Sequence, residues 1–357
     1  MNVIIPSIIQ FDLPQHLACP KPTEERNLER DEVRLLVTTN SGQIEHSTFN
    51  HLPSFLQKDD VLVVNTSATV PAALPILLPG EKKGRLHVST RFNNKKWLVE
   101  IREITGNKTI RWHEGEERMI FQLPSGANVT LEQRFYKNSQ WLDLWVADFN
   151  INQSMQSYLS KNALPIQYDK LDRQYPLSYY QTFFSFHPGS SEMPSAGRGF
   201  TSNLIDRLLK SGVTLAPIML HTGVSSLEEN ETPYPEYMEI DPVTASIINT
   251  AKNQGRRIIA IGTTAIRAIE TAVNNEGIVT PFRGNTELFI DENYTMKIVD
   301  GLLTGFHEPK ASHLSMLQSI GGFEHINIAY KEAIKAGYYW HQFGDLHLIL
   351  PREKVTL

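Results

Sequence analysis

Residues 257–271 read RIIAIGTTAIRAIET, and this stretch decides the fold more than any other part of the chain. Residues 258–261 form a short, largely β-branched apolar run, which is typical of a strand buried on both faces of a parallel sheet. Gly262, Thr263 and Thr264 interrupt this run, since glycine permits a tight turn and threonine can cap a helix. Apolar residues then recur at helical spacing. The stretch predicts a strand, a turn and a helix, with the turn at the sheet edge where α/β proteins bind ligands. A plain connecting turn without a ligand is the alternative.

The composition is that of a globular chain. Of its 357 residues 41% are hydrophobic and 20% charged, so we expect a packed core and roughly two domains. The 34 lysines and arginines against 39 aspartates and glutamates give a formal net charge of -5, so any nucleic-acid surface must be a local patch. Cys19 is the only cysteine, which excludes an intrachain disulfide and a cysteine-rich metal site.

The sequence predicts a cytoplasmic protein without a membrane segment. No apolar run reaches membrane-spanning length. The N-terminal residues lack a basic region and are interrupted by Pro6 and Pro14, unlike a signal peptide. We find no zinc-ligand spacing, phosphate-binding loop or glycine-rich dinucleotide fingerprint, and no metal is expected.

Strand and helix patterns alternate along most of the chain. Strands are expected at 33–38, 43–48, 61–64, 213–220, 258–261, 287–290, 296–299 and 346–350, and helices at 201–210, 242–254, 265–273, 311–320 and 323–336. Thr201 and Asp241 are the candidate N-caps of the first two helices. Between about 76 and 150, short strands and turn signals recur without a helical period, which favours a small barrel or sandwich. The predicted fold is α/β, a mostly parallel sheet covered by helices, with an inserted all-β barrel domain. Residues 1–75 and 153–357 would form the α/β domain, and 76–152 the inserted domain.

Polar residues follow three of the predicted strands, at His221-Thr222-Gly223, at Gly262-Thr263-Thr264 and in residues 305–310. If these strands are parallel neighbours, the three loops meet at one sheet edge, and His221, Thr264 and His307 line one cavity with residues 188–201 as its cover. An ordinary hydrogen-bonded histidine is the alternative for His221 and for His307. Arg267 and Glu270 stand three apart on the predicted helix, so they could bind a ligand or pair with each other.

Several short motifs resemble those of one enzyme family. They are Tyr180-Gln181-Thr182, Pro194-Ser195-Ala196-Gly197 with Phe200-Thr201, Leu220-His221 with Gly223, Gly262-Thr263-Thr264 with Arg267 and Glu270, and Asp300-Gly301 with Thr304, Phe306-His307 and Pro309-Lys310. In this order they resemble the S-adenosylmethionine:tRNA ribosyltransferase-isomerases of queuosine biosynthesis. The likeness runs from Phe11-Asp12-Leu13-Pro14 to Gly344-Asp345, nearly the whole chain.

The resemblance implies a β-barrel domain inserted into an α/β domain, and a reaction. The ribosyl group of S-adenosylmethionine, which is a substrate, would pass to 7-aminomethyl-7-deazaguanine in the tRNA anticodon and rearrange to give epoxyqueuosine. Adenine and methionine would leave. It implies catalytic roles for His221, Glu236, His307 and Lys310, and substrate binding by Tyr180, Gln181, Ser195, Gly197, Gly262, Thr263, Thr264, Arg267 and Glu270. The tRNA phosphates would meet cations of the barrel, among Lys82, Lys83, Arg85, Arg91, Lys95 and Lys96, unless these form only a solvated face.

The chain also departs from the family pattern. Gly199 stands where the family has a histidine, and Thr232-Pro233-Tyr234-Pro235-Glu236 lacks two further histidines. The segment that begins at Asn65 lacks an aspartate and two arginines of the family. These losses leave a second hypothesis open, a divergent paralogue that acts on another nucleoside or binds without catalysis.

Overall fold

The computed structural model describes residues 9–39, 41–93, 95–106, 108–137, 140–167, 171–224 and 234–351. Thr232 and Pro233, in one of the departing motifs, lie outside the described residues.

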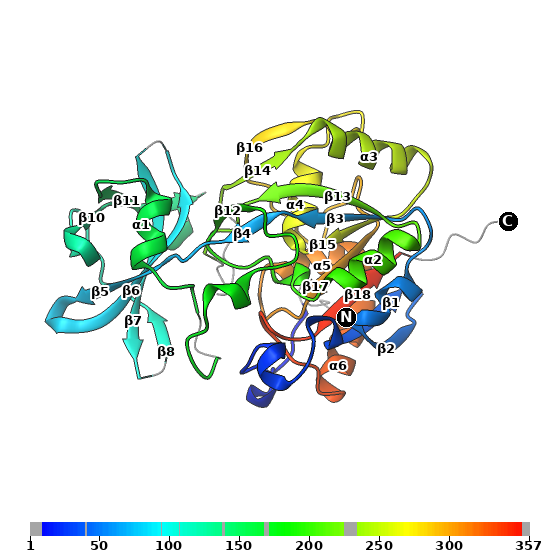
Figure 1. Cartoon of the computed structure of the whole chain (residues 1–357), viewed down its shortest axis with the longest axis horizontal. Coiled ribbons are helices and arrows are strands. Elements are labelled where there is room, and N and C mark those ends of the chain that lie inside the picture. Colours follow the sequence, from blue (N-terminus) through cyan, green and yellow to red (C-terminus); the bar gives the residue numbers. More distant parts are fainter. Residues whose placement is uncertain are drawn as a thin grey trace, which may run out of the picture.

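A nine-stranded sheet runs through the larger part of the described chain (Figure 1). The strand order is β16-β14-β13-β3-β15-β17-β18-β1-β2. In chain order these strands are β1 (Arg34–Thr39), β2 (Ile44–Thr48), β3 (Val61–Asn65), β13 (Thr214–Leu220), β14 (Glu236–Ile240), β15 (Ile258–Ile261), β16 (Phe282–Thr286), β17 (Gly301–Gly305) and β18 (Leu346–Leu350).

The sheet is mixed, so the prediction of a mostly parallel sheet is wrong. The pairs β13–β3, β3–β15, β15–β17 and β18–β1 are parallel. The pairs β16–β14, β14–β13, β17–β18 and β1–β2 are antiparallel. Two helices rather than one connect β17 to β18, so the chain re-enters the sheet in the opposite direction. A buried apolar strand has a similar composition whether it pairs in parallel or antiparallel, so the sequence could not reveal the direction of β18.

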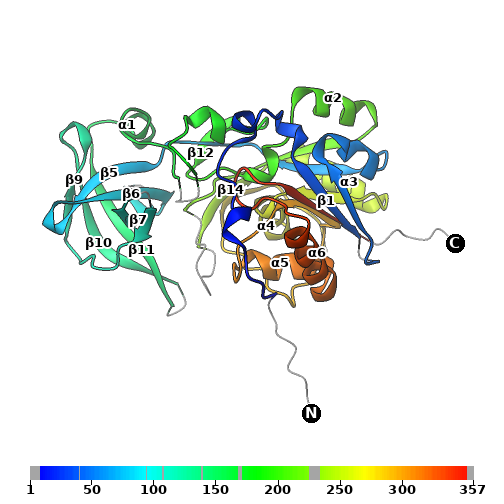
Figure 2. The same cartoon turned by 90° about the horizontal axis from the view of Figure 1, so that it is seen from below.

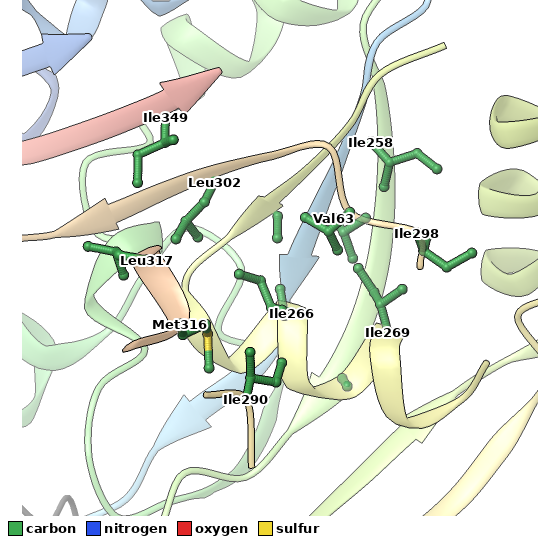
Figure 3. Close-up of a cluster of buried hydrophobic side chains, with 14 of the residues drawn as sticks. Val63, Ile258, Ile266, Ile269, Ile290, Ile298, Leu302, Met316, Leu317 and Ile349 are labelled. Carbon is green, nitrogen blue, oxygen red and sulfur yellow. The ribbon is translucent and has the colours of Figure 1, made fainter. Parts of the chain in front are cut away.

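Helices cover both faces of this sheet. They are α2 (Ser202–Lys210), α3 (Pro242–Asn253), α4 (Thr263–Thr271), α5 (His313–Gly321) and α6 (Phe323–Lys335). Helix α2 lies on one face, and α5 and α6 lie on the other (Figure 2). On the latter face, Ile266 and Ile269 of α4 pack toward Val63 of β3 and Leu302 of β17 (Figure 3). The apolar side of α4, which the helical spacing in residues 265–273 predicted, thus faces the central strands.

A second sheet, antiparallel throughout its described strands, is built between Ala73 and Asn150. Its order is β5-β6-β7-β11-β10-β9 with β8 on β7, and β5 touches β9, so the sheet nearly closes into a barrel. Helix α1 (Met155–Asn162) packs onto its apolar interior. The barrel lies beside the nine-stranded sheet (Figure 1). The strands are β5 (Ala73–Leu78), β6 (Lys82–Arg91), β7 (Lys96–Thr105), β8 (Lys108–Arg111), β9 (Ile120–Gln122), β10 (Asn128–Lys137) and β11 (Gln140–Asn150).

Short strands β4 (Ser67–Thr69) and β12 (His187–Ser190) pair in parallel between the two parts. The division of the chain at 75/76 and 152/153 into domains stays a prediction.

Most predicted elements are confirmed within a few residues, and two predicted strands are wrong. Thr201 and Asp241 cap α2 and α3 through their side chains, as predicted from their positions. Residues 287–290 and 296–299 form no strand. In the second segment the backbone N–H groups of Lys297, Ile298 and Val299 bond to the carboxylate of Glu270 instead of to a neighbouring strand.

Candidate functional site

Strands β13, β3, β15 and β17 run parallel, so the loops that follow them meet at one sheet edge, as predicted. A cavity of about 280 Å³ lies at this edge, and we call it the histidine cavity. Its polar wall includes Glu192, Ser195, Thr222, Gly262, Thr263, Thr264, Thr304, His307, Glu308, His313 and His341. Cys19, Met193, Phe306 and Phe343 add an apolar wall, and Arg102 and Arg111 reach it from the barrel.

The turn from β15 to α4 forms one wall of the histidine cavity. Gly262 is the N-cap of α4 with a φ of 89°, a left-handed conformation that glycine adopts without strain. Among the described residues no side chain caps the helix, so a threonine cap, which the sequence suggested, is wrong. The first N–H groups of a helix have no intrahelical partner, and in α4 they belong to the cavity-lining Thr263 and Thr264. This wall therefore suits an anion or a polar ligand edge.

Two stacked imidazoles line the histidine cavity. The rings of His307 and His313 lie 4.7 Å apart between centroids at an interplanar angle of 8°. His307 Nε2 lies 2.9 Å from the hydroxyl of Thr304. Burial, with the nearby His313 and His347, lowers the pKa of His307 well below its usual value, and burial with the charge of Arg267 lowers the pKa of His313 to about 4. Both rings are therefore neutral at neutral pH.

A third histidine is oriented by a carboxylate. His341 Nδ1 lies 2.9 Å from Glu308 Oε1, and both side chains are only 16% exposed. The buried Nε2 of His341 has no partner among the described residues. The backbone of His341 has a φ of 78°, which is uncommon for a residue other than glycine. A ring that lines a cavity, is held at one nitrogen by a carboxylate and keeps the other nitrogen without a partner among the described residues has the arrangement of a general base.

A smaller cavity of about 80 Å³ adjoins the histidine cavity, since Thr222, Thr263, Thr264 and His313 line both. Arg267 and Glu236 also line it and form a buried ion pair with each other. Gly223 donates its N–H to Glu236 at 2.8 Å, and Arg267 donates Nε–H to the carbonyl of Leu288 at 3.1 Å. Pairing of Arg267 with Glu270 is therefore wrong. Two buried nitrogens, Arg267 Nη2 and His313 Nδ1, have no partner among the described residues, which marks this cavity as suited to a polar ligand group.

His221 belongs to a different cavity, so the prediction that it shares one with Thr264 and His307 is wrong. Along β13, Ile218 and Leu220 face the core under α3 and α4, and strand alternation turns His221 to the opposite side. There its Nδ1 lies 2.7 Å from Ser67 Oγ, and its ring stacks 6.0 Å from that of Tyr237. Burial lowers the pKa of His221, and nearby His187 lowers it further.

We call this second space, of about 530 Å³, the aromatic cavity. Its wall includes Trp97 and Arg91 of the barrel, His221, Tyr237, Gly189 and Asn285. Thr222 lies in the walls of the aromatic and the histidine cavities. The two spaces thus meet beside the end of β13.

Five predicted site residues line neither of the two large cavities nor the small one. Tyr180 is buried against Phe343, and Gln181 holds the backbone of Thr69 with both ends of its amide. Gly197 packs near Thr182 and Phe184. Glu270 accepts hydrogen bonds from three backbone N–H groups and from Tyr294. Lys310 is exposed, with a φ of 66°. Ser195, Gly262, Thr263, Thr264 and His307 do line the histidine cavity, and their predicted roles stay predictions.

Several side chains of the histidine cavity were not predicted from the sequence. His313 and Glu308 stand close to the singled-out His307 in the sequence, so the spacing of polar residues after β17 was a usable signal. His341 comes from a loop before the last strand and gave no local signal. Arg102 and Arg111 were also not predicted, since the barrel cations proposed to meet tRNA were Lys82, Lys83, Arg85, Arg91, Lys95 and Lys96. Of those, Lys82 and Lys96 pair with Glu103 and Glu132.

Within the described ranges, no three or more histidine, cysteine, aspartate or glutamate side chains gather as a metal ion would require. No helix in that same part of the chain has the length and apolar character needed to cross a bilayer.

These features define an α/β protein with a mixed sheet, a nearly closed antiparallel barrel and ligand-sized cavities between them. The family model described as queuosine biosynthesis protein matches residues 7–349. The chain belongs to this family.

Its relatives are proteins named S-adenosylmethionine:tRNA ribosyltransferase-isomerase. The chain is 34% identical to one from Desulfitobacterium hafniense, over 95% of this chain and 98% of the relative. It is 32% identical to one from Staphylococcus haemolyticus, again over 95% and 98%. A crystal structure of S-adenosylmethionine tRNA ribosyltransferase from Thermotoga maritima shares the fold, with a TM-score of 0.54, 24% identity and coverage of 96% of this chain and 99% of that one.

Proposed function

We propose that this chain transfers and isomerises the ribosyl group of S-adenosylmethionine onto 7-aminomethyl-7-deazaguanine in the anticodon of tRNA, giving epoxyqueuosine. Membership of the queuosine biosynthesis family supports the proposal, and so do the names of the relatives. The structural observation that carries it is the pair of cavities that meet at Thr222, because the reaction joins two large substrates.

S-adenosylmethionine is assigned to the histidine cavity. The start of α4 offers N–H groups to ribose hydroxyls or to a carboxylate, and Phe306 and Phe343 offer apolar surface to an adenine ring. Arg267 and His313 line the adjoining small cavity, and their nitrogens without a partner in the described part of the chain, Nη2 and Nδ1, suit further polar atoms of the same ligand.

The deazaguanine base of the tRNA is assigned to the aromatic cavity. Proteins that read RNA stack unpaired bases on aromatic rings, and Trp97, Tyr237 and His221 supply such rings here. Arg91 in the same wall is exposed and suits a backbone phosphate. Binding of tRNA at the barrel and a cytoplasmic location belong to the same proposal.

We assign the general base to His341. The sulfonium centre acidifies the carbon next to it, so a base that removes a proton there starts the rearrangement. His341 lines the histidine cavity, and its buried Nε2 has no partner among the described residues. Glu308 fixes the ring and stabilises the imidazolium that forms. Adenine takes up a proton as it leaves, and the imidazolium of His341 can return one. Methionine leaves with the electron pair of its carbon–sulfur bond.

The test combines turnover and binding. Purified protein is incubated with S-adenosylmethionine and tRNA that carries 7-aminomethyl-7-deazaguanine, and the digested tRNA is analysed by mass spectrometry. We expect epoxyqueuosine, with release of adenine and methionine. The variant His341→Asn should lower kcat by roughly 100- to 10,000-fold, the usual range for a general base, while the Kd for S-adenosylmethionine stays within a few fold.

The control is His46→Asn. His46 also faces a carboxylate, Glu332, with 3.6 Å between His46 Nε2 and Glu332 Oε1, but it lies on β2, outside both cavities. Its turnover should match the wild type. Binding of S-adenosylmethionine without any product would instead support a non-catalytic paralogue. Full turnover by His341→Asn would remove His341 from the mechanism.

A further inference from the structure

One face of the barrel buries charges. Along β6 and β7, the side chains of Leu86, Val88, Val99 and Ile101 fill the barrel interior. Alternation turns their neighbours outward, where an antiparallel sheet normally meets water. Yet His87 and Glu100 are each only 1% exposed. The outward-facing Leu98 and Val146 pack there with Tyr234, which comes from outside the barrel, so this face is an internal contact.

Glu100 is the centre of a network on this face. Its Oε1 accepts from Arg102 Nη1 at 2.9 Å and from Arg111 Nε at 3.0 Å, and its Oε2 lies 3.2 Å from His87 Nδ1. Burial alone would raise the pKa of Glu100, but the hydrogen bond with His87 and the charges of both arginines lower it to about 2. Burial lowers the pKa of His87, so this ring is a neutral donor.

The two arginines stand side by side. Arg102 and Arg111 are directly opposite on β7 and β8, an arrangement of like charges that is unfavourable by itself. Thr109 further fixes Arg102 by accepting from Nε at 3.1 Å and from Nη2 at 2.9 Å. Glu100 thus fixes both guanidinium groups within one cluster. Both arginines line the histidine cavity.

We infer that Arg102 and Arg111, clamped side by side on Glu100, form a subsite that binds an oxyanion of the substrate, a carboxylate or a phosphate, in the wall of the histidine cavity. Guanidinium groups match the planar geometry of such anions, and a mostly buried position strengthens the bond. The identity of the anion rests on the proposed function. It is either the carboxylate of the methionine part of S-adenosylmethionine or a phosphate of the tRNA backbone.

The first experiment compares S-adenosylmethionine with its decarboxylated analogue by calorimetry in the wild type, Arg102→Gln and Arg111→Gln. Each variant leaves Glu100 with one arginine and with His87, so the barrel should fold, which circular dichroism checks. If the carboxylate is the anion, the wild type prefers the natural ligand by about tenfold or more, and both variants lose this preference. If a phosphate is the anion, the slope of the logarithm of the tRNA binding constant against the logarithm of the salt concentration instead becomes shallower by about one in each variant.

A third readout is independent of the proposed function. Inorganic phosphate at constant ionic strength should raise the Tm of the wild type but not of the two variants. The matched control is Arg85→Gln, because Arg85 faces Arg102 from β6 yet is outside the lining of the cavity. It should behave as the wild type with S-adenosylmethionine and with phosphate. In the tRNA assay the control is Arg207→Gln on the exposed side of α2, which should keep the wild-type salt dependence. Failure to bind S-adenosylmethionine or tRNA would count against the proposed function, while the phosphate assay still judges the subsite. If no assay separates the two variants from its control, the arginines only support Glu100 and the inference is overturned.

Discussion

Replacement of Arg267 by methionine tests whether the buried ion pair beside the histidine cavity is a structural requirement. The side chains of Arg267 and Glu236 are 8% and 10% exposed. Removing Arg267 leaves the Glu236 carboxylate buried with one donor that the structure gives it, the Gly223 N–H, and leaves the Leu288 carbonyl without the Nε–H of Arg267. An uncompensated buried charge of this kind costs about 3 to 5 kcal/mol.

The free energy of unfolding from denaturant titration is the assay. For a chain of 357 residues this loss corresponds to a drop in Tm of about 4 to 7 °C. The double variant Arg267→Met with Glu236→Gln should regain about 2 kcal/mol or more, because no charge is then buried alone and the amide oxygen can still accept from Gly223. Arg207→Met, on the exposed side of α2, is the control and should change stability by less than about 0.5 kcal/mol. Equal stability of the single and double variants would refute the reasoning.

Two further predictions concern the histidines. Because His313 has a pKa of about 4 in the folded protein against about 6.5 unfolded, its contribution to stability is complete above pH 6.5 and is lost as the pH falls toward 4. Between pH 7 and pH 5.5 the free energy of unfolding should fall by about 1 kcal/mol less in His313→Asn than in the wild type, as measured by denaturant titration. An equal fall in both proteins would contradict the assignment. In Gly189→Ala the new Cβ collides with the imidazole of His221. We therefore expect the affinity for tRNA to fall about tenfold or more, while the Kd for S-adenosylmethionine is unchanged. The reverse pattern would mean that each ligand binds in the other cavity.

The sequence determined most of the local elements and the sheet edge on which the cavities lie, although it did not predict strands β14, β16 and β17. Residues 257–271 predicted strand β15, the turn at Gly262 and helix α4, because burial on both faces and helical spacing leave local patterns. The caps at Thr201 and Asp241 followed from side-chain chemistry within one turn. The motifs also indicated the family, since short runs of residues survive along nearly the whole chain.

Tertiary structure decided which side chains share a space. Strand alternation turned His221 away from His307, and the partner of Arg267 was Glu236, 31 residues away, rather than Glu270 three residues on. Glu270 instead held the backbone of residues 297–299, which abolished a predicted strand. His341 and Arg102 reach the histidine cavity from segments far apart in the chain. No local pattern encodes such contacts, because they depend on how the barrel and the helices pack against the edge of the sheet.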